Sequence, residues 1–281
     1  MTETPSDQAD MKASADDILQ AADLLSAAMA NREACDPVRP LIEAHGLDGA
    51  YAVQKKLESE AVARGEVIVG RKIGLTAKVI QSQLGVDQPD FGFLTDAMEY
   101  GDGEEVPMSR LLQPRVEAEI AFVLDRDLCE EELSLGVVMN SIAYAVPAIE
   151  IVDSRVRDWK ISIYDTIADN ASAGLYVLGG MARKIDTLDL RLCGMSLDYA
   201  GEPVSTGCGA ACLGNPLNAV LWLARAMLRH GNPLKAGQVI LSGALGAMVP
   251  VTPGGAYTAR ISGLGSVTAN FSEASSSDSA G

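Results

Sequence analysis

Residues 114–124 read Pro-Arg-Val-Glu-Ala-Glu-Ile-Ala-Phe-Val-Leu, and this stretch has the two-residue period of a β-strand. Successive side chains of a strand point to opposite faces of the sheet. Glu117 and Glu119 therefore share one face, about 7 Å apart by strand rise, while apolar residues occupy the other. Two like charges held there are unfavourable unless a cation neutralises them or one is protonated. The alternative is a solvated strand face with two exposed glutamates.

A third carboxylate favours a metal site. Glu150 interrupts the apolar run 145–152 of another predicted strand, where an unpaired buried charge is costly. Three carboxylates from two core strands form a hard oxygen site, which suits Mg²⁺ or Mn²⁺. The spacing therefore predicts a divalent metal site at Glu117, Glu119 and Glu150.

Outward from these strands, the chain is typical of an α+β protein with a helical N-terminal region. Apolar spacing predicts helices between residues 16 and 65, and a capped helix from Asn215 to Gly231. Segments rich in β-branched residues predict strands at 67–75, 116–124, 141–152, 173–180, 188–199, 238–245 and 256–271. The expected organisation is a disordered arm (1–15), a helical region (16–66), a β-rich catalytic core (67–271) and a disordered tail (272–281).

Composition limits the possible functions. The 281 residues carry 22 basic and 38 acidic side chains, and the formal net charge of −16 argues against nucleic acid or an anionic membrane surface as a partner. With two histidines, His45 and His230, a histidine-rich zinc site is impossible. The five cysteines show no disulfide framework, and neither a signal pattern nor a membrane-spanning stretch is visible. We therefore expect a cytoplasmic protein.

Several motifs, taken in order, resemble one enzyme family. They are GRKIGLT (70–76), LGVDQPDFG (84–92), PRVEAE (114–119), AIEIVD (148–153) and DTIADNAS (165–172), and the likeness continues through 212–218 and 237–246. Over roughly residues 48–271, the chain resembles the 2-keto-4-pentenoate (2-hydroxypenta-2,4-dienoate) hydratases of the fumarylacetoacetate hydrolase superfamily. It departs from them at Gly254-Gly255, where relatives often carry Gly-Asp in a turn.

The resemblance implies a mixed β-roll, barrel-like core with a metal held by Glu117, Glu119 and Glu150. It also implies Lys72 and Asp90 in the active site, a cytoplasmic homo-oligomer, and a role in meta-cleavage degradation of aromatic compounds. The implied reaction adds water to 2-hydroxypenta-2,4-dienoate (2-oxopent-4-enoate) and gives 4-hydroxy-2-oxopentanoate. The expected partner is therefore a small 2-hydroxydienoate substrate.

Lys72 is the candidate for charge complement and proton transfer. Strand alternation places it with Gly70 and Gly74, which leaves open space beside the ammonium, and desolvation could lower its pKa into a usable range. Without the resemblance, a surface lysine would be the simpler interpretation. Asp90 lies in a predicted loop, where it is either a turn residue or a group that positions water.

Three further residues are candidate substrate contacts. Asn170 and Ser172 could donate to the substrate carboxylate, although capping a helix explains both equally well. Gly243 opens the glycine-containing stretch 243–246, which does not fit a nucleotide-binding loop because no Lys-Ser/Thr follows.

Other functions remain open at this point. A 4-oxalocrotonate decarboxylase or an acylpyruvate-type carbon–carbon hydrolase would share the fold, although the scarcity of histidine disfavours hydrolysis. The non-enzymatic alternative is a structural partner subunit of a hydratase–decarboxylase complex, but such a subunit would have no reason to keep the three glutamates and Lys72 together. An active hydratase could also associate with a paralogous decarboxylase.

Overall fold

The stretch that carries Glu117 and Glu119 forms strand β5 (Arg115–Leu124), which pairs antiparallel with β6 (Ile142–Val152). The computed structural model describes residues 5–78, 81–82 and 86–274. Its helices are α1 (Pro5–Asn31), α2 (Arg39–Ile42), α3 (Gly46–Ala63), α5 (Leu135–Asn140), α6 (Ile163–Ala168) and α7 (Pro216–Arg229). The remaining strands are β1 (Ile68–Gly74), β2 (Asp90–Thr95), β3 (Glu99–Gly101), β4 (Glu105–Val106), β7 (Ala173–Leu178), β8 (Gly194–Tyr199), β9 (Glu202–Cys208), β10 (Val239–Leu241), β11 (Val249–Pro250), β12 (Ala256–Ile261) and β13 (Gly265–Phe271).

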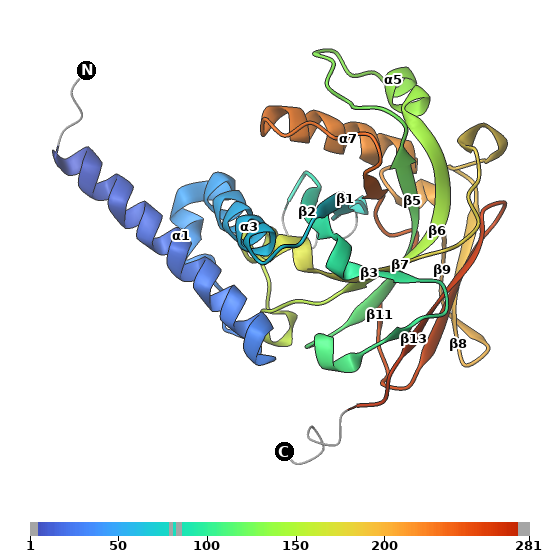
Figure 1. Cartoon of the computed structure of the whole chain (residues 1–281), viewed down its shortest axis with the longest axis horizontal. Coiled ribbons are helices and arrows are strands. Elements are labelled where there is room, and N and C mark those ends of the chain that lie inside the picture. Colours follow the sequence, from blue (N-terminus) through green and yellow to red (C-terminus); the bar gives the residue numbers. More distant parts are fainter. Residues whose placement is uncertain (1–4, 79–80, 83–85, 275–281) are drawn as a thin grey trace.

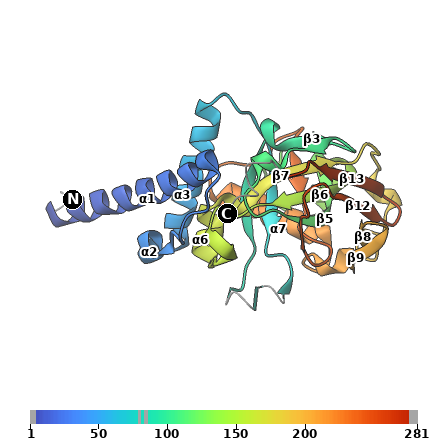
Figure 2. The same ribbon diagram turned by 90° about the horizontal axis from the view of Figure 1, so that it is seen from below.

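The strands form two mixed sheets (Figure 1). The eight-stranded sheet has the order β2-β1-β10-β5-β6-β7-β3, with β11 paired to β5, and the five-stranded sheet has the order β4-β13-β12-β8-β9. The pairs β1–β10, β3–β7 and β4–β13 are parallel, whereas β5 pairs antiparallel with both β6 and β10. Figure 2 shows helices α1–α3 at one end of the molecule and strands β8, β9, β12 and β13 at the other. This architecture confirms the predicted α+β fold with a helical N-terminal region.

Alternation on β5 separates the main core from the face that carries the glutamates. One face of β5 contributes Val116, Ala118, Ile120, Phe122 and Leu124 to a core shared with the smaller sheet and with α7. Burying one such large side chain stabilises the fold by roughly 1.5–3 kcal/mol. The other face continues from Glu119 to Ala121, which belongs to a smaller apolar cluster with Leu94, Val146, Ala148, Tyr176, Val239 and Leu241. A polar site therefore lies beside an apolar floor on one face of the sheet.

Helix α7 follows the pattern that predicted it. The Asn215 side chain accepts a hydrogen bond from the Leu217 amide at 2.9 Å, and Pro216 occupies the first turn. The buried face includes Val220, Leu223 and Met227, which pack into the main core. The predicted boundaries of this helix are confirmed.

The N-terminal helices pack on α6 through a separate apolar cluster. Its buried members are Ala21, Ala22, Leu25, Val38, Ile42, Ala50, Val53, Val156, Ile163, Ile167 and Ala168. Helix α1 begins at Pro5, inside the segment 1–15 that we predicted to be a disordered arm, so the helix is longer than expected. The prediction relied on apolar spacing, which starts only at Ile18 and cannot detect a polar helical extension. The predicted tail lies outside the described residues from 275 onward.

Some predicted strands are divided or shortened. Residues 256–271 form the hairpin β12–β13, because Gly263 and Gly265 adopt positive φ angles of 79° and 120° at the turn. The segments 188–199 and 238–245 are strands only over Gly194–Tyr199 and Val239–Leu241.

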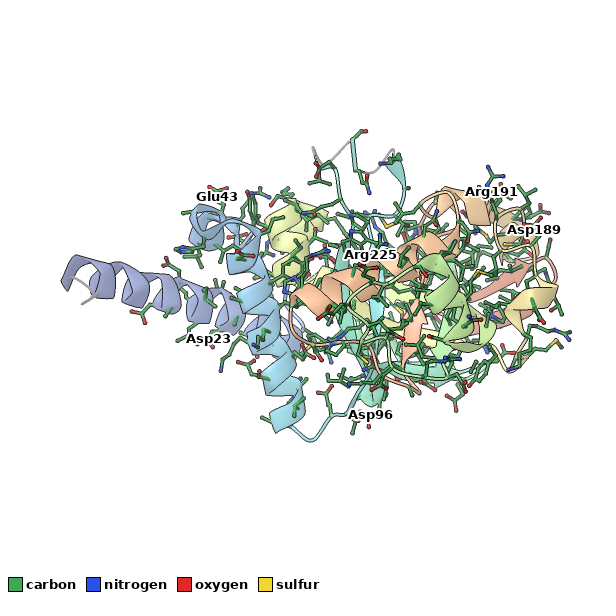
Figure 3. The ribbon with its side chains drawn as sticks, turned by 90° about the horizontal axis from the view of Figure 1, so that it is seen from above. Asp23, Glu43, Asp96, Asp189, Arg191 and Arg225 are labelled. Atoms are coloured by element: carbon green, nitrogen blue, oxygen red, sulfur yellow. The ribbon has the colours of Figure 1, made fainter. Side chains whose placement is uncertain are left out.

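Charged side chains are spread over the molecule, as shown by Asp23 and Glu43 in the N-terminal helical region and by Asp189 at the opposite end (Figure 3). In the part of the chain that the structure describes, no helix has the length and apolarity needed to cross a bilayer.

Candidate active site

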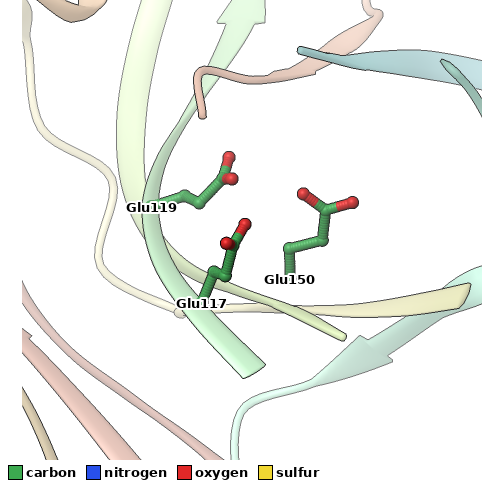
Figure 4. Close-up of side chains that lie close together, drawn as sticks. All are labelled: Glu117, Glu119 and Glu150. Atoms are coloured by element: carbon green, nitrogen blue, oxygen red, sulfur yellow. The ribbon is translucent and has the colours of Figure 1, made fainter. Parts of the chain in front are cut away.

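The three predicted metal ligands converge. Glu117 and Glu119 leave the same face of β5, and Glu150 lies opposite Glu117 in the β5–β6 register. One oxygen from each carboxylate can be chosen so that all lie within 4.8 Å of one another (Figure 4). Glu119 and Glu150 are buried, whereas Glu117 is half-buried. The spacing argument therefore identified a real cluster of carboxylates.

The cluster contains carboxylate oxygens that lack hydrogen-bond partners. Among the described residues, Glu119 Oε1 and both oxygens of Glu150 accept no hydrogen bond, although Glu150 Oε1 lies 3.0 Å from Lys72 Nζ as an ion pair. A buried charged group left without partners is strongly disfavoured. Unpaired oxygens on two of the three converging carboxylates fit a hard divalent cation, for which oxygen is the preferred ligand.

The raised pKa values of Glu117 and Glu119 agree with a cation site. Burial, reinforced by the charge of Glu150, raises the pKa of Glu117 to about 7. Burial and the two neighbouring glutamates also raise the pKa of Glu119 well above its usual range, against a hydrogen bond from the Gly243 amide. Without a cation the cluster therefore retains protons near neutral pH, and a divalent cation would displace them.

Lys72 lies at the centre of this charge cluster. Its side chain is buried, and Nζ donates a hydrogen bond of 2.8 Å to the Ala171 carbonyl besides its ion pair with Glu150. Burial lowers the pKa of Lys72, but the surrounding carboxylates, led by Glu150, outweigh burial and raise it. We predicted a lowered pKa from the sequence. Neighbours along one strand do not include the carboxylates that converge from β5 and β6, and these reverse the direction.

Asp90 belongs to a strand and not to a loop. It begins β2 opposite Gly74 in the register, and it is fully buried. A Cβ atom on Gly74 would lie 2.2 Å from Asp90 Oδ1 and 3.5 Å from Lys72 Nζ, so the space predicted beside the ammonium is filled by the Asp90 carboxylate. Burial raises the pKa of Asp90 to about 6, while Lys72 opposes this effect. Neither Asp90 oxygen has a hydrogen-bond partner among the described residues.

A cavity of about 360 Å³ opens beside these groups. Of the predicted residues, Lys72, Asp90, Glu117 and Ser172 line it. Other parts of its wall are Leu75, Thr76, Arg115, Val152, Trp159, Ile161, Thr166, Ala244 and Met248. The wall thus combines carboxylates, two cations and a large apolar surface, which is the composition of a small-molecule site.

The turn 170–172 has an unusual backbone. Its three residues have positive φ angles of 54°, 51° and 53°, a conformation that non-glycine residues adopt only when their surroundings enforce it. The buried Arg155 guanidinium enforces it, because it donates to the Asp169 carboxylate before the turn and to the Ala173 carbonyl after it. The turn directs the Ala171 carbonyl to Lys72. Ser172 Oγ is buried without a partner among the described residues, so it stays a candidate substrate contact.

Two predicted substrate contacts have other roles in the structure. Asn170 pairs with the backbone of Phe93, accepting from its amide at 2.7 Å and donating to its carbonyl at 3.0 Å, and it lies outside the cavity lining. The Gly243 amide donates to Glu119 Oε2 at 2.8 Å, so Gly243 orients a predicted metal ligand. Sequence spacing placed both residues near the site but could not show which groups already occupy their hydrogen bonds.

Arg115 and Trp159 were not predicted from the sequence. Both line the cavity, and Arg115 Cζ lies 4.5 Å from the centroid of the Trp159 ring, in a cation–π arrangement. Arg115 shares its strand face with Glu117 and Glu119, so the same two-residue period could have identified it. Neither histidine lines the cavity: His45 Nε2 lies 3.1 Å from Asp17 Oδ2, and the His230 ring lies 4.9 Å from that of Tyr51.

Comparison with known proteins agrees with this geometry. The model of the fumarylacetoacetate (FAA) hydrolase C-terminal family matches residues 68–272. The chain belongs to the fumarylacetoacetate hydrolase family. Within it, the chain is 54% identical over 257 residues to the TodF product hydratase of Pseudomonas putida strain F1, covering 92% of this chain and 96% of that protein. It is 53% identical over 252 residues to the 2-keto-4-pentenoate hydratase of Paraburkholderia xenovorans strain LB400, covering 90% and 94%.

A solved structure has the same fold along nearly the whole chain. The 4-oxalocrotonate decarboxylase from Pseudomonas putida G7, complexed with magnesium and adipate, matches with a TM-score of 0.87 and 37% identity over 90% of this chain and 97% of that one. The same decarboxylase is also known in complex with calcium and acetate. The family resemblance inferred from the motifs is therefore confirmed.

Proposed function

We propose that this protein is a metal-dependent hydratase that converts 2-hydroxypenta-2,4-dienoate into 4-hydroxy-2-oxopentanoate during meta-cleavage degradation of aromatic compounds. Two relatives that are more than half identical over at least 90% of the chain are named as hydratases. The observation that carries the proposal is the meeting of the carboxylate cluster with Lys72 and Asp90 at one cavity.

Glu117, Glu119 and Glu150 would hold the cation, for which we propose Mg²⁺ or Mn²⁺. A divalent cation bound there would supply Lewis-acid stabilisation of the enolate charge. The carboxylate-only ligand set and its unpaired oxygens support this choice. The magnesium and calcium in the related decarboxylase are consistent with a site for hard cations.

Lys72 and Asp90 are proposed to move the protons of the reaction. Hydration adds a proton to carbon 5 and a hydroxyl group to carbon 4 of the dienoate, and the proton of the 2-hydroxyl group is transferred to carbon 3 as the enol becomes the 2-oxo product. Lys72 stays protonated because the neighbouring carboxylates raise its pKa, and binding of a cation by those carboxylates would reduce this effect and make Lys72 a better acid toward carbon 5. Asp90 has a pKa of about 6, so its carboxylate can accept the proton that water releases on adding to carbon 4. Both groups lie beside Gly74, where one proton passed between them restores the starting state.

The rest of the cavity suits the uncharged diene. Leu75, Val152 and Ile161 contribute apolar wall, and Ser172 offers a hydroxyl whose hydrogen bonds are not taken by described residues. An apolar wall excludes water except where it is needed, which strengthens the electrostatic interactions inside the cavity.

The assay offers freshly generated 2-hydroxypenta-2,4-dienoate with Mg²⁺, with Mn²⁺ and with a chelator, and follows the loss of dienol absorbance and the product formed. We expect metal-dependent 4-hydroxy-2-oxopentanoate. Absence of this product in every metal condition would refute the proposal. The same assay is applied to Lys72→Met and Asp90→Asn, which should lose hydratase activity. The control is Lys160→Met, which removes an exposed lysine and should keep the activity.

A second candidate rests on the fold comparison. The 4-oxalocrotonate decarboxylase has 37% identity to this chain and a TM-score of 0.87. The two functions separate when 2-oxohex-3-enedioate is offered, because a decarboxylase releases CO₂ from it. Release of CO₂ without hydration of the pentadienoate would replace the hydratase proposal with this one.

We also propose that the protein forms a homo-oligomer and can associate with a paralogous decarboxylase. Leu19 and Leu24 on α1 are 45% and 41% exposed, which leaves apolar surface available for a second copy. Light scattering coupled to size-exclusion chromatography measures the assembly. A monomer at all concentrations would contradict this proposal without affecting the proposed reaction.

A further inference from the structure

We infer that Arg115, stacked on Trp159, binds the carbon-1 carboxylate of the 2-hydroxydienoate substrate. This inference rests on the proposed function, because that function defines the anion. The need for such a residue follows from the charge of the site. When all groups are ionised, the four carboxylates of Glu117, Glu119, Glu150 and Asp90 exceed Lys72 and a bound divalent cation by one negative charge, so the site without Arg115 would repel an anionic substrate. A cation with free donors is required to select the carboxylate end of the molecule.

The first observation is the position of Arg115. It begins β5, pairs with Val152 of β6, and shares its face with the two glutamates that follow it. Alternate residues of a strand lie about 7 Å apart, so the arginine is one step along the strand from Glu117. Arg115 and Glu117 are half-buried, whereas Glu119 is fully buried, so the face runs from solvent toward the interior.

The second observation concerns the hydrogen bonds of Arg115. A guanidinium carries five N–H donors. Within the described ranges, the Arg115 side chain donates to Met248 Sδ, a weak acceptor at 3.9 Å from Nη1. Lys72 is the other cation in the cavity lining, and it is already engaged by Glu150 and the Ala171 carbonyl. Arg115 therefore has donors available for a ligand.

The third observation is that Trp159 fixes the guanidinium. The indole Nε1 donates a hydrogen bond of 3.1 Å to the Gln113 carbonyl, which holds the ring beneath Arg115. Stacking on the ring face leaves the N–H groups at the edge of the guanidinium plane free to bind both oxygens of a carboxylate. A preorganised donor pair loses little rotamer entropy on binding.

The arrangement also orients the substrate. Arg115 stands on β5, whereas Lys72 and Asp90 stand on β1 and β2, and all three line the same cavity. A dienoate whose carboxylate lies at Arg115 extends its carbons 4 and 5 toward the two groups that move protons. The reversed orientation would bring the carboxylate to Asp90, where like charges repel.

The test measures binding, so it does not depend on turnover. Calorimetry with saturating Mg²⁺ compares 2-oxopentanoate with 2-oxopentanamide, which lacks the charge, in wild type, Arg115→Met, Arg115→Lys and the control Arg157→Met. Arg157 pairs with Asp36 near the surface and is absent from the cavity lining. We expect Arg115→Met to weaken binding of 2-oxopentanoate by about 10- to 100-fold, the loss typical of a charge-assisted pair. The amide should bind equally to all four proteins.

Three outcomes would overturn the inference. One is unchanged binding of 2-oxopentanoate to Arg115→Met, and another is an equal loss for the acid and the amide, which would indicate a general packing role. The third is a loss confined to 2-oxohexanedioate, which would place Arg115 at a distal carboxylate. If Arg115→Met does not fold, Arg115→Lys must show a smaller loss for the acid alone. If binding of 2-oxopentanoate depends on Arg115 but the protein does not hydrate the dienoate, the role of Arg115 stands and only the proposed reaction is refuted.

Discussion

Replacing Glu117, a proposed metal ligand, should stabilise the metal-free protein. In the absence of a cation, Glu117 is a half-buried carboxylate beside Glu150, and its pKa is raised to about 7 by burial and by that charge. The folded state therefore holds this proton more tightly than the unfolded chain does. Glu117→Gln keeps the shape of the side chain and removes the charge, so the variant no longer has to be ionised in an unfavourable place.

The magnitude follows from the two pKa values. The folded value is about 7 and the ordinary value is 4.5. Each pH unit between them corresponds to about 1.4 kcal/mol, so the full effect is about 3 kcal/mol. Because Glu117 keeps contact with water in the cavity, we expect about 2 kcal/mol after screening. For a raised carboxyl pKa, wild-type stability is lost as pH rises from about 4.5 to about 7 and stays reduced above that.

The measurement is urea unfolding of wild type and Glu117→Gln with a chelator, at about pH 8.5 and about pH 5, where the linkage relation predicts a large and a small difference. The control is Glu202→Gln, because Glu202 is exposed on β9 and lies outside the cavity lining. The same series with saturating Mg²⁺ should reverse the order, since only wild type gains the free energy of metal binding.

Two results would refute this reasoning. In the first, wild type with chelator is as stable as Glu117→Gln at the higher pH. In the second, the difference between the proteins does not shrink on acidification, so that ionisation of Glu117 is not its cause. An equal gain in Glu202→Gln would point instead to the net negative charge of the whole protein.

The remaining predictions concern the metal, the fit around Asp90, and Lys72. Mg²⁺ affinity should fall as pH decreases below about 7, with protons released on binding, because Glu117 has a pKa of about 7; calorimetry in buffers of different ionisation enthalpy measures this, and pH-independent affinity would contradict it. Gly74→Ala places a Cβ 2.2 Å from Asp90 Oδ1, so it should lower kcat by about 100-fold or more. Its Mg²⁺ affinity should change little. The control Gly180→Ala should have the kcat of wild type, because its added Cβ meets no atom within 4 Å. Lys72→Met should lower kcat by about 100- to 10,000-fold. The same variant should bind Mg²⁺ more tightly in alkaline buffer, because the ammonium that lies 3.0 Å from Glu150 is removed. Weaker Mg²⁺ binding by Lys72→Met in alkaline buffer would contradict this charge balance.

The carboxylate cluster was predictable because its causes are local. Alternation within β5 alone places Glu117 and Glu119 on one face, and an apolar run alone marks Glu150 as a buried charge. Their direct approach needs only that β5 and β6 be neighbours in the sheet, which the structure confirms. The family motifs extended the prediction to Lys72 and Asp90, and both line the cavity.

Contacts between distant segments could not be predicted from the sequence. Asn170 is far from Phe93 in the chain, yet the β2 backbone uses both ends of its amide. Gly243 reaches Glu119 only because β10 brings the segment that follows it beside β5. A strand period reports the face on which a residue lies, but it cannot report which partner on another element satisfies its hydrogen bonds. The direction of the Lys72 pKa was mispredicted for the same reason.

Charge balance explains how an acidic protein can accept an anionic substrate. The cavity region carries four carboxylates, on Glu117, Glu119, Glu150 and Asp90, against the two cations Lys72 and Arg115. When all are ionised, two negative charges remain, and a divalent cation neutralises them. In the proposed site each positive charge would then have a separate role, because the metal would hold the three glutamates together, Lys72 would hold a proton, and Arg115 would be free for the substrate carboxylate. Removing the metal, Lys72 or Arg115 would leave the cavity with a net negative charge. The three positive groups therefore depend on one another through charge even where they are not in contact.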